Sequence, residues 1–72
     1  MTIINFGAVA VGNDPIFGVV VYGEDDSGRE GWQPWSSGTP EQQEWVREQV
    51  RNSPLRKCLL QGMEETLFGK GG

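Results

Sequence analysis

The pattern of hydrophobic and polar positions divides the chain into a β-rich start, a polar middle and a helical end. Residues 3–11 and 16–22 are rich in Val, Ile, Phe and Tyr, which are typical strand residues. The segment 12–15 between them reads Gly-Asn-Asp-Pro, which favours a turn because Gly and Asn tolerate a positive φ and Pro fixes φ. The pattern therefore predicts an antiparallel β-hairpin.

The polar middle, residues 23–39, is built mainly from Gly, Ser and acidic residues. A short third strand is expected near 29–33, because the segment 25–28, Asp-Asp-Ser-Gly, would make a turn after the second strand. Pro34 would end that strand or hold it at a sheet edge, since proline has no N–H for the ladder.

Two cap-plus-proline sequences mark helix starts in the last part of the chain. Thr39-Pro40, with Gln42 completing a capping box, predicts a helix that runs to about Arg51. Ser53-Pro54 repeats the signal and predicts a second helix that stops at Gly69. The expected buried positions are Trp45, Val46 and Val50 in the first helix, and Leu55, Cys58, Leu59, Leu60, Met63, Leu67 and Phe68 in the second.

These elements predict a single small α+β domain over residues 1–72. Its architecture is an antiparallel β-hairpin or three-strand meander followed by two α-helices packed on one sheet face. A chain of 72 residues can only just build one sufficient core, so a large catalytic cleft is not expected. One cysteine cannot form an internal disulfide, and no apolar run approaches the roughly 20 residues of a membrane-spanning helix. We therefore expect a cytoplasmic protein.

Negative charge is concentrated in the first half of the chain. Residues 1–38 hold five acids against the single base Arg29, whereas residues 39–72 hold five acids and five bases. The whole formal charge of −4 therefore belongs to the first half. An acidic chain is unsuited to direct binding of nucleic acid or of an anionic membrane, which need clustered Lys and Arg. It is suited to a partner with a basic protein surface.

Candidate catalytic chemistry is sparse. The chain has no histidine, which removes the commonest general base and metal ligand. Cys58 lies on an apolar stripe, where a cysteine is expected to be a small core residue. The segment 24–26 carries three consecutive acids in a Gly- and Ser-rich loop, where we expect them to be solvated and poorly suited to general acid catalysis. Arg29 interrupts any calcium-loop spacing. We expect no enzyme, no catalytic residue, no cofactor and no metal site.

The candidate residues for binding a partner are acids and tryptophans. Trp32 and Trp35 either fold back over the sheet or remain exposed as anchors, and the acids either steer a basic partner or only keep the protein soluble. The full candidate set is Asp14, Glu24, Asp25, Asp26, Glu30, Trp32, Trp35, Glu64 and Glu65.

The small size, the acidic segment 24–30 and the overall charge resemble those of phage-encoded anti-CRISPR proteins, in particular acidic inhibitors of type I systems. The resemblance is one of kind, because that group shares no sequence motif. It implies a non-enzymatic inhibitor in the host cytoplasm, which binds a type I CRISPR effector complex (Cascade) and blocks target DNA binding by mimicking DNA. The alternative is a small accessory or assembly protein that acts by protein–protein docking, as a monomer or weak homodimer.

Overall fold

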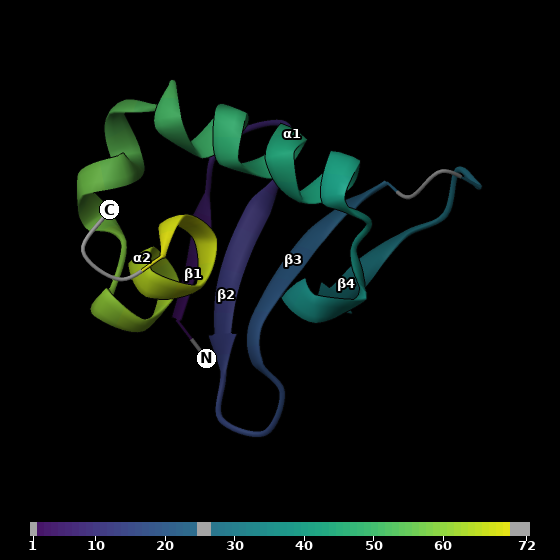
Figure 1. The fold of residues 1–72 in the computed structure, drawn as a ribbon, viewed down its shortest axis with the longest axis horizontal. Helices are drawn as coiled ribbons and strands as arrows, with labels where there is room; N and C mark the ends of the chain where they lie inside the picture. The colour runs from purple at the N-terminus through teal and green to yellow at the C-terminus, as the bar shows by residue number, and fades with distance from the viewer. Residues whose placement is uncertain (1, 25–26, 70–72) are drawn as a thin grey trace.

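The computed structural model describes residues 2–24 and 27–69 (Figure 1). A four-stranded antiparallel sheet is followed by two α-helices, which confirms the predicted α+β arrangement and gives the sheet four strands. The elements are β1 (Thr2–Asn5), β2 (Ala10–Asp14), β3 (Gly18–Glu24), β4 (Glu30–Pro34), the 3-10 helix η1 (Trp35–Ser37), α1 (Pro40–Arg51), the 3-10 helix η2 (Pro54–Cys58) and α2 (Gln61–Phe68). The strands follow each other in space in chain order, β1-β2-β3-β4.

The apolar run 3–11, expected as one strand, is two strands joined by a tight turn. The Phe6 N–H donates to the Val9 carbonyl at 2.8 Å, and the Gly7 N–H donates to Asn5 Oδ1 at 2.8 Å. Gly7 has a φ of +99°, which a residue with a side chain rarely adopts. The turn signal in the sequence was Asn-Phe-Gly, which the surrounding β-branched residues obscured.

The turn expected at 12–15 lies further along the chain. Gly12 and Asn13 belong to β2, and the turn occupies residues 15–17, before Gly18 with its φ of +76°. The expected third strand near 29–33 is present as β4, and Pro34 is its last residue on an edge strand of the sheet, as predicted.

Helix α1 begins and ends where the sequence predicts. Its capping box is complete: the Gln42 N–H donates to Thr39 Oγ1 at 3.1 Å, and the Thr39 N–H donates to Gln42 Oε1 at 2.9 Å. The second predicted helix is divided instead. Ser53 caps η2, the backbone then becomes extended at Leu59 and Leu60, and α2 follows until Gly69 ends it at a φ of +84°.

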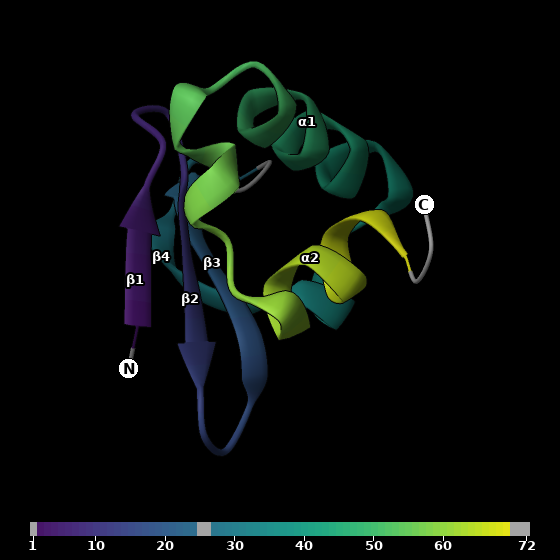
Figure 2. The ribbon, with the colours of Figure 1, turned by 90° about the vertical axis from the view of Figure 1, so that its left-hand side faces the viewer.

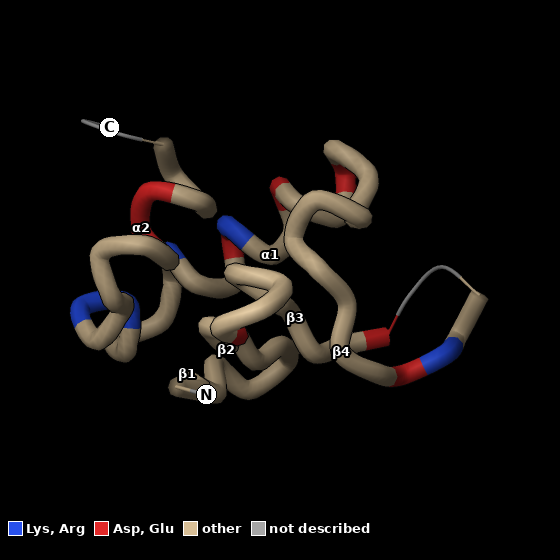
Figure 3. Tube along the Cα trace, turned by 90° about the horizontal axis from the view of Figure 1, so that it is seen from below, with Lys and Arg blue, Asp and Glu red and all other residues tan. Residues whose placement is uncertain are grey.

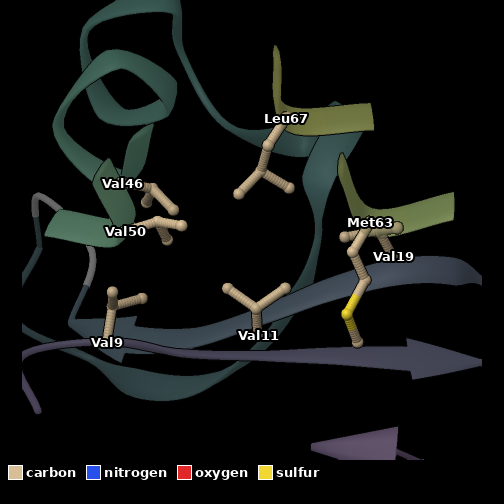
Figure 4. Packing of buried hydrophobic residues seen from close by; sticks show 7 residues of the cluster. All are labelled: Val9, Val11, Val19, Val46, Val50, Met63 and Leu67. Atoms are coloured by element: carbon tan, nitrogen blue, oxygen red, sulfur yellow. The ribbon is translucent and has the colours of Figure 1, made fainter. Parts of the chain in front are cut away.

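Both helices cover the same face of the sheet, as Figure 2 shows with the sheet nearly edge-on. The buried core lies between these two layers, and its side chains point toward one another from the strands and both helices (Figure 4). Its members are Val9, Val11, Val19, Val46, Val50, Met63 and Leu67.

Several positions expected in the core are exposed. Trp45 is exposed because the neighbouring Val46 takes the inward position on α1. Leu55, Cys58 and Leu60 are exposed because η2 and the extended Leu59–Leu60 segment break the helical periodicity on which the predicted stripe depended. The expectation that Cys58 is a core residue was wrong.

Helix α2 has only eight residues, so its place depends on Met63 and Leu67 rather than on helix propensity. We expect Leu67→Ala to lower the free energy of unfolding by about 2–5 kcal/mol, because Leu67 is fully buried and its truncation leaves a cavity. Urea denaturation would measure this. The matched control is Leu60→Ala, since Leu60 is 42% exposed and its loss should change stability by less than about 0.5 kcal/mol. Equal losses for the two variants would contradict the core described here.

Candidate functional site

The face of the sheet opposite the helices is apolar and uncovered by either of them (Figure 2). Side chains alternate between the two faces of a strand, and the register places Ile3, Val20, Tyr22, Trp32 and Pro34 together on this open face. Val20 is buried, whereas Tyr22 and Trp32 are each 40% exposed. A sheet face that carries large exposed apolar side chains is a candidate binding surface.

Two large aromatic side chains, Tyr22 and Trp32, lie together on the open face. They stand directly opposite each other on β3 and β4, with ring centroids 5.3 Å apart in an edge-to-face arrangement at 66°. Such aromatic pairs contribute about 0.5–1.5 kcal/mol beyond the area they bury. Because each ring is held by its neighbour, the pair presents a pre-ordered aromatic surface, and Trp is enriched at interface hot spots.

Acids lie on the same face at the end of the β3–β4 hairpin. Glu24 and Glu30 are directly opposite each other in the register, next to the aromatic pair. Like charges in this position repel and destabilise the pairing, and a cationic group brought by another molecule would relieve that repulsion. Asp25 and Asp26 lie outside the described residues. Arg29, in the connecting loop, donates from Nε to Ser27 Oγ at 3.3 Å.

Asp14 ends β2 and is held by the turn that follows it. Its Oδ1 accepts hydrogen bonds from the backbone N–H groups of Ile16 at 2.7 Å and Phe17 at 2.9 Å. The bonds from Phe17 and then Ile16 lower the pKa of Asp14 below its ordinary value, because they favour the charged carboxylate. This turn presents Ile16 and Phe17 as exposed apolar side chains.

The two tryptophans flanking Gln33-Pro34 have different environments. Trp32 is on the open face, whereas Trp35 is half-buried and packs against the core on the helix side. The Arg47 guanidinium stacks over the Trp35 ring at 5.3 Å, and Gln43 Nε2 donates to the Trp35 carbonyl at 2.9 Å. Of the two predicted alternatives, folding back therefore describes Trp35, whereas Trp32 remains exposed.

The candidate acids of α2 lie away from the hairpin acids. Figure 3 shows the acidic residues of α2 and those of the β3–β4 hairpin at opposite ends of the molecule. Glu64 forms an ion pair with Arg56 at 3.0 Å, and Glu65 Oε1 accepts a hydrogen bond from Gln61 at 3.2 Å. The fold does not join these two acids with Glu24 and Glu30 in one surface.

The described basic side chains outside the β3–β4 loop belong to α1 and η2, on the helix side. Arg47 pairs with Glu44 at 3.4 Å, and Arg51 and Arg56 stack over the Phe68 ring at 5.7 Å and 4.3 Å. The strand positions of the open face therefore carry acids and no described base, which makes that face suited to a basic partner.

Sequence reasoning did not identify four exposed apolar side chains of the sheet and its turn, namely Ile3, Ile16, Phe17 and Tyr22. The signal for Tyr22 was present, because in a strand that buries Val19 the alternation places residue 22 on the opposite face. Ile16 and Phe17 were assigned to the strand rather than to the turn, so their exposure could not be anticipated.

Within residues 2–24 and 27–69, no group of three or more acids or cysteines has the geometry to hold a metal ion. The described helices are all too short or too polar to cross a bilayer. No protein-family model, no curated protein and no solved structure matches this chain.

The bonds to Asp14 predict a pH dependence of stability. Its pKa is lower in the folded than in the unfolded protein, so its stabilising contribution is complete above the ordinary Asp value of about 3.9 and is lost as the pH falls through the folded value. Asp14→Asn retains the acceptor oxygen without the charge. We expect the thermal midpoint of the variant to lie below that of the wild type at pH 7 and the difference to shrink at pH 3. A difference that is constant between the two pH values would contradict this role of the carboxylate.

Proposed function

We propose that this protein is a docking protein without catalytic chemistry, which binds a basic surface of another protein through the open face of its sheet. The observation that carries the proposal is the Tyr22–Trp32 pair, half-exposed on a sheet face that no described helix covers and bordered by Glu24 and Glu30. Aromatic residues supply affinity at an interface, whereas the acids supply orientation and the rate of encounter.

The first partner to test is a type I CRISPR effector complex, because the chain resembles in kind the acidic proteins that inhibit such complexes. A protein seated on the basic channel for target DNA would exclude DNA by occupying its site. The arrangement of the acids favours a mixed interface over pure mimicry of a phosphate backbone. Glu24 and Glu30 adjoin an aromatic pair, while Glu64 and Glu65 are remote from them.

The proposal predicts that Trp32 is the main anchor for the effector. We expect Trp32→Ala to weaken binding of a purified type I effector by about 30-fold or more, equivalent to at least about 2 kcal/mol, because a central aromatic side chain is lost. Surface plasmon resonance at low and high salt, with and without competing DNA, would measure this. Leu55→Ala is the matched control, because Leu55 is exposed to a similar degree on η2, outside the open face, and should leave the affinity unchanged.

The contribution of the acids is tested by charge reversal. We expect Glu24→Lys with Glu30→Lys to slow association and to abolish protection of a targeted plasmid in a CRISPR-active host. Lys residues at both positions keep the like-charged cross-strand pair, so the change in fold stability is small. Glu48→Lys with Glu65→Lys makes the same change in net charge on the two helices, away from the hairpin, and should retain protection.

Three outcomes are distinguishable. Binding that is lost in the hairpin variant and competed by DNA supports the inhibitor. Binding that persists at high salt, is lost on Trp32→Ala and is not competed by DNA supports docking in an accessory or assembly role instead. Unchanged plasmid protection in the hairpin variant, or no binding by the wild type, would overturn the proposed use of this face toward the effector.

A further inference from the structure

A small cleft lies on the helix-covered side of the sheet, between the start of α1 and the end of the β3–β4 hairpin. Its volume is about 80 Å³, and the paired residues Gly23 and Gly31 form part of its lining on the sheet. Trp35 and Trp45 line it from η1 and α1. Small-molecule sites typically have roughly 300–1,000 Å³, so this space is suited to the end of one side chain rather than to a cofactor.

The glycine at position 31 is required by neither conformation nor packing. Gly23 and Gly31 both lack a positive φ, and a Cβ built on Gly31 would meet no atom within 4 Å. Glycine in a strand is unfavourable and often marks a place where a ligand or another chain approaches closely. Two glycines directly opposite each other therefore keep open a space that larger residues would fill.

The charges around the cleft favour a cation. Among the described lining residues, Glu24 is the charged one, and the others are apolar residues, glycines and glutamines. The N-terminus of α1 adds a partial positive charge of roughly one half, which Glu41 in its first turn offsets.

We propose that the cleft receives one lysine or arginine side chain of the partner, with its aliphatic stem against Trp35 and Trp45 and its cationic end toward Glu24. The inference rests on the proposed function, because it names the group that a basic partner would insert. Glu24 connects the two surfaces, since it ends β3 on the open face and also lines the cleft. A basic segment crossing the end of the hairpin can therefore contact both.

The test uses n-butylammonium as a probe of the lysine side chain and the three indole N–H signals of the ¹⁵N-labelled protein as the readout. We expect titration in the millimolar range to shift the Trp35 and Trp45 signals and to leave Trp32 unmoved. Neutral n-butanol should bind about two- to fivefold more weakly, the range that one exposed ion pair supplies, and butyrate should cause no shift. Equal binding of butanol and butylammonium, or no shift at Trp35 and Trp45, would overturn the proposal.

Gly31→Val supplies the matched variant. Valine suits a strand and its Cβ meets no neighbour, so we expect an unchanged or higher thermal midpoint together with loss of the butylammonium shifts. Gly62→Ala, on α2 with equal space around it, should retain them. Binding to the effector then separates the two proposals. Affinity lost on Trp32→Ala but unchanged in Gly31→Val overturns the cleft alone, whereas a responsive cleft in a protein that binds no effector overturns the proposed function alone.

Discussion

The rest of the structure depends on burial of one face of the sheet by two short helices. Val11 and Val19 on the strands, with Val9 just before β2, meet Val50 and Leu67 on the helices. This contact decides which side of every strand points inward. Because strand side chains alternate with a period of two, the outward set is then determined as well. The aromatic pair and the two opposed glutamates share a face as a consequence of where the valines are buried.

Arg47 ties the separate elements of this small domain together. Its guanidinium stacks over Trp35 of η1 and pairs with Glu44 on its own helix, and its Nε donates to the Leu67 carbonyl of α2. A chain of this length has few side chains with which to hold its elements together. One long side chain that stacks on a ring, forms an ion pair and donates a hydrogen bond therefore connects elements that would otherwise need several contacts. This contact also holds Trp35 on the helix side of the sheet, away from the open face.

The sequence was sufficient to predict where an element begins or ends when the signal for it was local. The capping box at Thr39 located α1 to the residue, and Pro34 marked the end of an edge strand, because each depends on neighbours only a few positions away. The sequence was insufficient where tertiary contacts decide the backbone conformation. Periodicity could not reveal that Leu59 and Leu60 are extended, so Cys58 was misplaced in the core. Of the candidate site, Glu24, Glu30 and Trp32 could be proposed from the sequence. Their common face, and the position of Tyr22 beside Trp32, required the strand register.

The acids at the end of the hairpin have a second consequence, which concerns copies of the protein itself. An uncovered aromatic sheet face promotes self-association in a crowded solution, since two such faces could stack together. Two copies stacked with their hairpin ends together would bring Glu24 and Glu30 of each toward those of the other, and the repulsion would oppose that arrangement. The carboxylates at the end of the hairpin therefore disfavour this arrangement of two copies of the protein.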